Sequence, residues 1–565
     1  MNKKEKILFW CILFINGIFV FAGLGSFKSP HTSMDLISQY DSSEEIVLDL
    51  GSHKNVQSLY LHLGHILDRI VSISYYDEEK EEWVVVDETA DVKSNYNWNE
   101  IVIKKNIRFV GIVPSSGRIV INEIVVLDDA GNMIRPANTE EYPLLFDEQD
   151  LFPEEMTYYY RTMFDEVFYA GSAYEFLHGE MMAEKTHPPM GKILISLGIM
   201  LFGITPFGWR FVTAFFGLAM LPVVYRFLYR LFRDVKVALL GMTLLSLDFM
   251  HFTLARIGTL DTIIAFFILV TFSMLLEVFI RVGADLKKAK EKPEASLVLF
   301  IAFHAFAIGM GVSTKWTGFY AMAGAAICFL IFWVEKFVLA LKKQEIKQKK
   351  YLLNILVKAV LLYTLVPLCI YMLSFLPQAV VQGERNLFKV MLESSISMLD
   401  FHDSIVFEHP YSCAWYTWLW NETPLLDAIN ILKNGKVSMV ATMGNPIIWW
   451  TGLLAVFFML YQLIRKKDMK AGYLLAAYLF MLVPWIFVKR TVFIYQYYGS
   501  SLFLSCMLAY SLWLISKKVK KIIPIYLEIT ICIFAMFYPF ISGFPVQTSY
   551  IQKFLQWLPD WKFLG

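Results

Sequence analysis

The chain has 565 residues, of which 57% are hydrophobic, 16% aromatic and only 18% charged. Its mean hydropathy is +0.50, and soluble domains carry roughly 25% charged residues. With repeated apolar runs of about 18 to 25 residues, this composition excludes a purely soluble protein and predicts an integral membrane protein. The formal net charge of +1 says little as a total, no nucleic-acid partner is expected, and the distribution of charge is more informative.

The chain contains six cysteines, and all but Cys413 lie within apolar runs. None of them shows metal-ligand spacing, so they are interpreted as small core residues. The sequence therefore predicts neither a disulfide framework nor a zinc site. No cofactor is evident, no metal ligand set is expected, and a metal requirement stays open.

A basic leader, Met1–Lys6, precedes an apolar run from Ile7 to about Leu24. The run is long and no small-x-small cleavage site follows it, so we expect an uncleaved first transmembrane helix rather than a signal peptide. The positive-inside rule places the leader in the cytoplasm and the following residues outside.

Residues 26–150 are polar and rich in acidic residues, with short runs of alternating β-type character that predict a small extracellular β-sandwich. The runs are 46–50, 59–63, 70–75, 83–86, 109–113 and 119–127. Three strings, Leu48-Asp49-Leu50-Gly51, Tyr75-Tyr76-Asp77 with Trp83, and Ile121–Val126, resemble discoidin-type, galactose-binding-like domains. Many such domains bind glycans and others are spacers, so a glycan ligand and a spacer role are both open.

Apolar segments then alternate with basic patches that fall at every second loop. The predicted spans are about 206–231, 235–253, 261–282, 296–314, 317–339, 351–376, 447–464, 471–488, 493–515 and 522–541. With a cytoplasmic N-terminus, all five basic patches become cytoplasmic, which supports this topology. The fold class is thus a polytopic α-helical plasma-membrane protein with about eleven transmembrane helices and its C-terminus outside.

This topology requires that Met190–Ile204, which is short and contains Lys192, lies on or dips into the outer face instead of spanning. Two large regions then face outward and should carry the chemistry. The predicted layout is a first transmembrane helix (1–25), the β-sandwich (26–150), outer-face juxtamembrane helices (151–205), transmembrane helices (206–376), an extracellular loop (377–446), further transmembrane helices (447–541) and an extracellular tail (542–565).

The acidic pair Asp165-Glu166 lies just ahead of the main spans. The surrounding segment 157–178 is compatible with a helix that carries Asp165, Tyr169 and Ser172 on one face. Such an interfacial helix would present a carboxylate at the level of the lipid headgroups. A solvated charge pair at a helix N-terminus is the alternative interpretation.

Several cations fall at the outer ends of predicted spans. They are Arg210, Arg256, Lys315, Lys489 and Arg490. Each alone could be an interfacial residue whose charged end reaches toward water. Gathered against outer-face carboxylates, they predict a site for a phosphate carried by a lipid, with acid/base groups beside it.

Seven motifs in chain order resemble the protein O-mannosyltransferase family, and the similarity extends from about residue 155 to 515. They are Phe164-Asp165-Glu166, His187-Pro188-Pro189-Met190-Gly191-Lys192, Pro206–Phe211, Leu247–Phe252 with Arg256-Ile257, Lys315-Trp316-Thr317-Gly318, His409-Pro410-Tyr411-Ser412 and Arg490–Tyr495. The resemblance implies a GT-C fold whose first outer loop carries an Asp-Glu pair.

The resemblance also implies a reaction, an inverting transfer of mannose from a polyprenyl-phosphate carrier to Ser or Thr hydroxyls of exported proteins. It implies that Asp165 is the general base and that Glu166 positions the acceptor or the base. Arg210, Lys315 and Arg490, with Lys489, would bind the donor phosphate. His187, Arg256, His409 and Tyr411 would shape the site.

Two features depart from the family pattern. Gln496 stands where relatives often have His, which puts part of a donor or acceptor contact in doubt. The loop 377–446 is too short for MIR domains, whereas the insert lies in the first outer loop, which suggests a bacterial-type enzyme. Transfer of another sugar to a lipid or cell-wall glycan is the nearest alternative, and a transporter or flippase is the alternative from another class.

Overall fold

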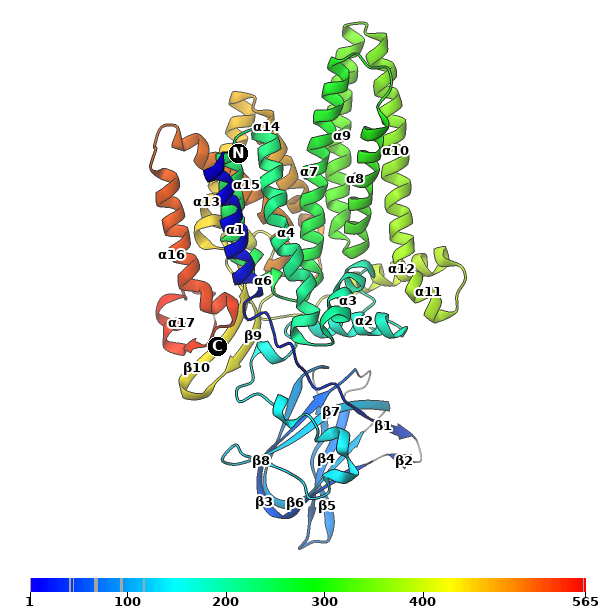
Figure 1. Ribbon diagram of the computed structural model, residues 1–565, viewed down its shortest axis with the longest axis vertical. Coiled ribbons are helices and arrows are strands. Elements are labelled where there is room, and N and C mark those ends of the chain that lie inside the picture. Colours follow the sequence, from blue (N-terminus) through cyan, green and yellow to red (C-terminus); the bar gives the residue numbers. More distant parts are fainter. Residues whose placement is uncertain are drawn as a thin grey trace.

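A computed structural model of the protein describes residues 2–39, 42–43, 45–65, 70–91, 95–114, 117–561 and 563–564. It consists of a helical bundle and a separate β-rich domain at one end of the bundle (Figure 1). The N-terminus lies toward the opposite end of the bundle, and the C-terminus lies toward the end that faces the β-rich domain. Lys562 and Gly565 of the predicted tail lie outside the described residues.

The β-rich domain, called the β-domain below, is an antiparallel sheet in the order β2-β1-β7-β3-β6-β4-β5, with β8 paired to β7. Its strands are β1 (Met34–Gln39), β2 (Ser42–Ser43), β3 (Ile46–Leu63), β4 (Ile70–Asp77), β5 (Glu82–Asp91), β6 (Trp98–Pro114), β7 (Gly117–Asp128) and β8 (Met133–Ile134). Apolar side chains from β1, β3, β4, β6 and β7 share one buried core.

Each predicted β-type run lies in one of these strands. The runs 46–50 and 59–63 belong to one long strand, β3, because the pairing register shifts between Asp49 and Lys54 and the chain does not turn back there. The expected sandwich is therefore one continuous sheet with long, irregular strands. The discoidin-type resemblance stays a prediction.

The segment between the β-domain and α2 has four short 3-10 helices. They are η1 (Thr139–Glu141), η2 (Pro143–Leu145), η3 (Gln149–Leu151) and η4 (Tyr158–Tyr160).

The bundle is built from long apolar helices. They are α1 (Lys3–Phe21), α4 (Pro206–Phe232), α5 (Val235–Ser246), α6 (Phe249–Ala255), α7 (Leu260–Lys287), α8 (Ala295–Thr314), α9 (Thr317–Lys342), α10 (Ile346–Ser374), α13 (Pro446–Lys466), α14 (Met469–Leu482), α15 (Tyr498–Ser516) and α16 (Ile522–Ser542). The 3-10 turns η7 (Val483–Phe487) and η8 (Ile494–Tyr497) extend α14 and precede α15.

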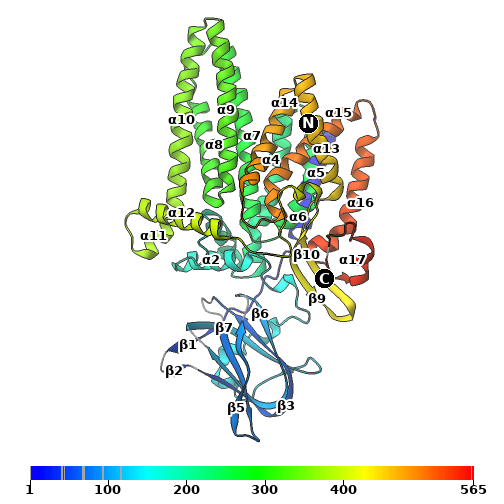
Figure 2. The same ribbon diagram turned by 180° about the vertical axis from the view of Figure 1, so that it is seen from behind.

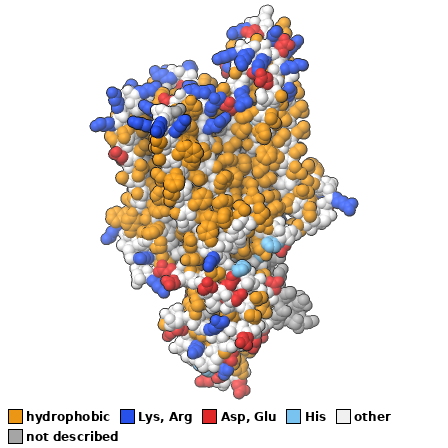
Figure 3. Space-filling model, in the orientation of Figure 1, with side chains coloured by type: hydrophobic (Ala, Val, Ile, Leu, Met, Phe, Trp, Pro, Cys, Tyr) orange, Lys and Arg blue, Asp and Glu red, His pale blue; other side chains and the backbone are white. Residues whose placement is uncertain are grey.

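Nine helical segments of the described chain are long and apolar enough to cross a membrane, or ten with the bent pair α5–α6. The expected total of about eleven includes α1, which is not among them because its first turn carries Lys3, Lys4, Glu5 and Lys6. On the face shown in Figure 3, hydrophobic side chains form a broad belt across the bundle, and lysines and arginines gather at its end away from the β-domain. The protein is thus a multi-pass membrane protein.

The segment predicted as one continuous span over 235–253 is broken, because α5 and α6 meet at a bend of 62°. The backbone of Asp248 is extended, with φ −78° and ψ 127°, which ends the helical hydrogen-bond ladder. Asp248 Oδ1 accepts hydrogen bonds from Asn445 N at 3.1 Å and Trp449 Nε1 at 3.0 Å. These bonds stabilise the break between α5 and α6, where the apolar pattern predicts a continuous helix.

A layer of shorter elements lies between the bundle and the β-domain (Figure 2). It contains α2 (Glu166–His178), α3 (Met190–Phe202), α11 (Leu376–Gln382), α12 (Leu387–Ser404), η5 (Thr417–Trp420), β9 (Leu425–Ile431), η6 (Lys433–Gly435), β10 (Lys436–Thr442), β11 (Val546–Gln547) and α17 (Thr548–Phe554). The 13-residue α3 is too short to span a membrane, which agrees with its expected place. The predicted loop 377–446 and the tail share one sheet, in the order β11-β10-β9.

Candidate active site

The predicted helix over 157–178 begins only at Glu166, after a tight turn. Glu166 N donates to Met163 O at 3.1 Å, and Phe164 adopts a left-handed φ of 48°. A left-handed phenylalanine is uncommon and is kept only where surrounding contacts impose it. The Phe164 ring packs edge-on against Tyr495, with the ring centroids 5.7 Å apart. This strained turn, rather than a helix face, fixes where Asp165 lies.

Glu166 anchors the turn to the bundle and is completely buried. Its Oε1 accepts from Arg210 Nε and Gly258 N, each at 2.7 Å. Its Oε2 accepts from Met163 N at 2.9 Å, Trp209 Nε1 at 3.2 Å and Arg210 Nη2 at 2.7 Å. All these partners are hydrogen-bond donors, and together they occupy the lone pairs of the carboxylate. Glu166 therefore has no lone pair left to receive a hydrogen bond from the hydroxyl of an acceptor substrate.

Arg210, expected at the donor phosphate, is instead the partner of Glu166 and is 0% exposed. Besides the two bonds to Glu166, its guanidinium donates to Leu24 O and Tyr158 O through Nη1 and to Arg161 O through Nη2, at 2.8–3.0 Å. A guanidinium has five N–H donors, and all five are used. The prediction that Arg210 binds phosphate does not fit this geometry, because no N–H remains for a ligand.

Arg256, like Arg210, is held within the protein by backbone carbonyls. It is buried, and its guanidinium donates to carbonyls at the end of α1, among them Val20 O at 2.9 Å and Ala22 O at 2.7 Å. It therefore ties α1 to the junction of α6 and α7 and does not line the cavity described below. Its expected role in shaping the site is not supported by these contacts.

Asp165 differs from its neighbour because its carboxylate has no hydrogen-bond partner among the described residues. The side chain is partly exposed and does not cap α2. Desolvation raises its pKa to about 7, the positive charge of Lys315 opposes this, and the negative charges of Asp261 and Glu184 add to it. A partly exposed carboxyl with a pKa near neutrality can accept a proton at physiological pH.

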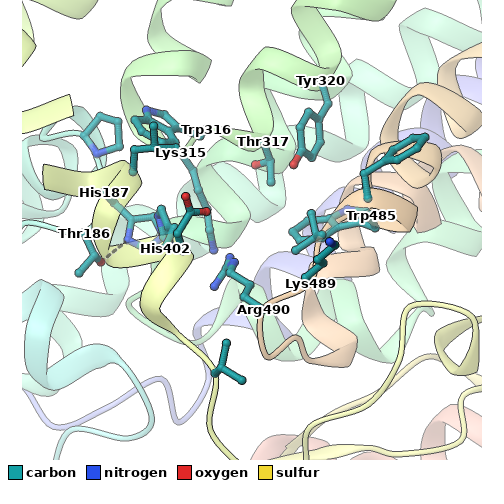
Figure 4. A pocket seen from close by; sticks show the side chains of 16 residues that line it. Thr186, His187, Lys315, Trp316, Thr317, Tyr320, His402, Trp485, Lys489 and Arg490 are labelled. Atoms are coloured by element: carbon teal, nitrogen blue, oxygen red, sulfur yellow. Dashed lines mark hydrogen bonds between the residues drawn. The ribbon is translucent and has the colours of Figure 1, made fainter. Parts of the chain in front are cut away.

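A cavity of about 420 Å³ opens at the junction of α8 and α9 (Figure 4). Asp165 does not line it, but Lys315 does, and the charge of Lys315 acts on the Asp165 carboxyl. The lining of the cavity includes the predicted cations Lys315, Lys489 and Arg490. Neither Lys489 nor Arg490 forms an ion pair or a hydrogen bond within the described chain. In Figure 4 their side chains approach the cavity from the η7 side, opposite Lys315. The cavity therefore has cationic groups on two walls, as a phosphate would require.

Lys315 lies between the cavity and Asp165. Its Nζ is 2.8 Å from Asp261 Oδ1 and 5.1 Å from the centroid of the Tyr495 ring. An ammonium group has three donors, and Asp261 uses one. Lys315 also borders a second, smaller cavity formed with Tyr495 and Gln496. Gln496 Oε1 accepts from Phe493 N at 3.1 Å, so this residue, which departs from the family pattern, holds the turn that follows Arg490.

His187 forms another part of the cavity wall, as predicted for a residue that shapes the site. Its Nδ1 lies 2.8 Å from Thr186 Oγ1 and 3.4 Å from Glu184 Oε1. Lys192 Nζ donates to Glu184 Oε2 at 2.6 Å and to His187 O at 2.9 Å. Desolvation lowers the pKa of His187, opposed by the bond to Glu184. The ring is therefore neutral at pH 7 and adds no charge to the cavity.

Several lining residues belong to none of the motifs or cations recognised in the sequence, among them His402, Tyr320, Trp485 and Phe487. The His402 ring packs edge-on against His187, with centroids 5.4 Å apart, and its pKa is lowered to about 4, first by desolvation and then by the charge of Arg490. The string Phe401-His402-Asp403 in a predicted outer loop was an available signal for His402. Nothing in the sequence showed that α12 would bring it to this cavity.

His409 and Tyr411 lie beside the cavity and do not line it. The His409 ring packs edge-on against Phe493 at 5.1 Å, and Tyr411 N donates to His409 Nδ1 at 3.2 Å. The neighbouring Cys413 N donates to Val492 O at 3.0 Å. His409 and Cys413 therefore hold the outer loop against the segment that follows Arg490.

For a metal ion, the described residues offer one group of carboxylates close enough to share it, Glu123, Asp147 and Glu148. This group lies in the β-domain and its connection to α2, and none of its members lines the cavity.

Comparisons with known proteins agree with the geometry. Residues 202–381 match the family of dolichyl-phosphate-mannose-protein mannosyltransferases, and residues 387–561 match the C-terminal four-transmembrane region of protein O-mannosyltransferases. Together the two matches cover more than half of the chain.

Two similar proteins are the polyprenol-phosphate-mannose--protein mannosyltransferases of Mycobacterium tuberculosis and Mycolicibacterium smegmatis. Each is 24% identical, and the alignments cover 71% of this chain and 86% or 87% of theirs. The fold is similar to the Saccharomyces cerevisiae protein O-mannosyltransferase Pmt1-Pmt2 complex bound to the sugar donor, with a TM-score of 0.60, 13% identity, and coverage of 71% of this chain and 89% of that chain. The chain therefore belongs to the protein O-mannosyltransferase family and has a GT-C fold.

Proposed function

We propose that the protein transfers mannose, with inversion, from a polyprenyl-phosphate carrier to Ser or Thr hydroxyls of exported proteins. The observation that carries this proposal combines two features. The Asp165 carboxyl has no hydrogen-bond partner among the described residues and a pKa raised to about 7, and it is close enough to Lys315 to feel its charge. Lys315 lines a cavity together with Lys489 and Arg490, two cations that are unpaired within the described chain and suit a phosphate. The names of the relatives supply the sugar and the acceptor class.

The proposed reaction uses these groups in one displacement. The Asp165 carboxylate takes the proton of the acceptor hydroxyl, and the hydroxyl oxygen attacks the anomeric carbon of the sugar from the side opposite the phosphate. The bond from that carbon to the phosphate oxygen breaks, and its electron pair leaves with the phosphate. Lys315, Lys489 and Arg490 stabilise the charge that develops there, so the leaving group needs no general acid.

We propose that the reaction takes place on the outer face of the plasma membrane. The gathering of lysines and arginines at the opposite end of the bundle supports this orientation, because basic residues favour the cytoplasmic side (Figure 3). In this orientation α1 begins on the cytoplasmic side, and the β-domain and the C-terminus lie outside. A glycan ligand for the β-domain stays a prediction.

The test is transfer by the purified protein in lipid nanodiscs, with a set of polyprenyl-phosphate sugars and Ser/Thr-containing peptides, read by mass spectrometry. We expect mannose on a peptide hydroxyl. Transfer of a different sugar, or only to lipid or glycan acceptors, would replace the proposal with its nearest alternative. A parallel assay in sealed liposomes separates the transporter alternative, which predicts movement of a lipid or solute across the bilayer without bond formation.

Replacing Arg490 by Ala should raise the KM for the lipid-linked donor by roughly tenfold to a hundredfold, because a charge-assisted hydrogen bond contributes about 1.5–3 kcal/mol. Donor titrations at saturating peptide measure this. Arg490→Lys keeps the charge and should recover part of the affinity. A wild-type donor KM in Arg490→Ala would remove Arg490 from the phosphate site.

The transfer rate should rise with pH and level off above about 7. Asp165 must be deprotonated to act as a base, and its pKa is raised to about 7 by desolvation. Below that pH the rate should fall about tenfold per unit. Rates at saturating donor and acceptor, measured between pH 5 and 9, check this. A flat profile across pH 6–8 would contradict the assignment of Asp165 as the base.

A further inference from the structure

The β-domain contacts the segment that carries the proposed base, and it does so at both ends of α2. Before α2, Asn97 Oδ1 accepts a hydrogen bond from Thr162 N at 2.6 Å, and Asn97 Nδ2 donates to Thr162 Oγ1 at 2.9 Å. Near the other end, His65 Nε2 lies 3.1 Å from Glu175 Oε1. Two loops of the β-domain, residues 63–65 and 95–98, therefore hold α2 and the turn before it.

The contact at Thr162 is buried on both sides. Asn97 is 5% exposed and Thr162 is 6% exposed. A buried side-chain amide that exchanges two hydrogen bonds with one residue fixes both its position and its orientation. Thr162 is three residues before Asp165, at the start of the strained turn.

Tyr96 links these two contacts, because it adjoins Asn97 in the chain and its ring stacks on that of His65, with the centroids 6.5 Å apart. It adopts a left-handed φ of 57° and is 3% exposed. Its ring lies 6.2 Å from that of Trp209, and it shares an apolar cluster with Tyr169 of α2. Strained backbone conformations of this kind persist where the surrounding contacts impose them. The backbone conformation of loop 95–98 is thus imposed by its contacts with α2 and the bundle.

The turn before α2 is held from two directions. Glu166 ties it to the bundle through Arg210, Trp209 and Gly258. Asn97 ties it to the β-domain. Asp165 lies between the two anchors in the chain, and its side chain has no hydrogen-bond partner among the described residues, so its position depends on both anchors.

We propose that the β-domain positions the catalytic turn, and that Asn97 is the positioning residue through which it acts. The inference rests on the proposed function, with Asp165 as the base, and it gives the inserted domain a role that needs no ligand of its own. Loss of the Asn97 contacts should displace the base relative to the acceptor hydroxyl while the donor cavity stays intact, because Lys489 and Arg490 belong to a different segment.

The test compares Asn97→Ala with Asn97→Asp and with a matched control, Asn138→Ala. An aspartate keeps both contacts, since its oxygens accept from Thr162 N and from the Thr162 hydroxyl. Like Asn97, Asn138 accepts one hydrogen bond and donates another through its side-chain amide, from Asp49 N at 2.9 Å and to Val47 O at 2.8 Å. Neither partner belongs to α2 or to the turn before it. Replacing Asn138 weakens the β-domain without touching the turn.

We expect Asn97→Ala to lower kcat by about 10²-fold, the effect of misplacing a reacting group by roughly 1 Å, with an unchanged donor KM. Asn97→Asp should restore most of the rate, and Asn138→Ala should match the wild type. Rates are normalised to protein that elutes as a single folded species. If Asn97→Ala does not fold, Thr162→Val read against Thr162→Ser measures the same contact.

Equal kcat values for Asn97→Ala and Asn138→Ala would overturn the inference, as would Asn97→Asp being as slow as Asn97→Ala. Failure of the proposed function looks different, because the wild type would then transfer no mannose. If the wild type is active, Asp165→Asn is inactive and Asn97→Ala is fully active, only the positioning role is lost.

Discussion

Asp165→Asn should lower the transfer rate by about 10³–10⁴-fold, at the upper end of the contribution of a general base, while the protein stays folded. The amide has the shape of the carboxyl but cannot take the proton of the acceptor hydroxyl. No hydrogen bond within the described residues depends on the Asp165 side chain, so the substitution removes none. Mass-spectrometric transfer rates and apparent melting temperatures, measured on the same preparation, check both parts.

The effect on stability has a defined sign. Desolvation raises the pKa of Asp165 from 3.8 to about 7, so the folded protein binds this proton more tightly than the unfolded chain does. The resulting stability is present at low pH and is lost as the pH rises toward 7. Asn resembles the protonated form, so above pH 7 the variant should be at least as stable as the wild type. Retained turnover by Asp165→Asn would contradict the assignment of Asp165 as the base.

Glu166→Gln should have the opposite phenotype, although it is the same chemical change at the next residue. All the hydrogen-bond partners of the Glu166 carboxylate are donors. An amide in either orientation turns an NH₂ group toward some of them, and Arg210 keeps a buried charge without its counterion. Breaking a buried ion pair costs about 3–5 kcal/mol.

We therefore expect Glu166→Gln to lower the apparent melting temperature and the yield of folded protein in detergent. Asp165→Asn is its matched control. Arg210→Met should resemble Glu166→Gln, since it leaves the same carboxylate buried without its partner. If Glu166→Gln had wild-type stability and lost only activity, Glu166 would contact the reaction directly and would not be an anchor.

The contrast between these two acids shows where sequence reasoning is sufficient and where it is not. The long apolar runs predicted nearly every membrane-crossing helix, because each span is a local property of about twenty residues. They did not predict the bend within 235–253, where Asp248 bonds to residues about two hundred positions later. The helix expected over 157–165 failed for a similar reason, since the turn there is imposed by partners from the bundle and the β-domain.

The candidate site shows the same division. The motifs located the Asp165-Glu166 pair and the cations Lys315, Lys489 and Arg490, because residue type and place at a span end are visible in the chain. The motifs could not distinguish side chains that are available to a ligand from those whose hydrogen-bonding groups are all used within the protein. Arg210 and Arg490 look alike in sequence, but one is enclosed by three carbonyls from two distant segments and the other faces a cavity.

The sequence by itself determined that this is a multi-pass membrane protein with a β-rich insert and a pair of acids ahead of its spans. Composition and local periodicity suffice for that much. Only the tertiary structure decided that the Asp165 side chain has no hydrogen-bond partner among the described residues, while Glu166 anchors the turn to the bundle. It also decided that the insert contacts this turn. The physical reason is that hydrogen-bond saturation depends on which distant residues are brought within 3 Å, and no local pattern records that.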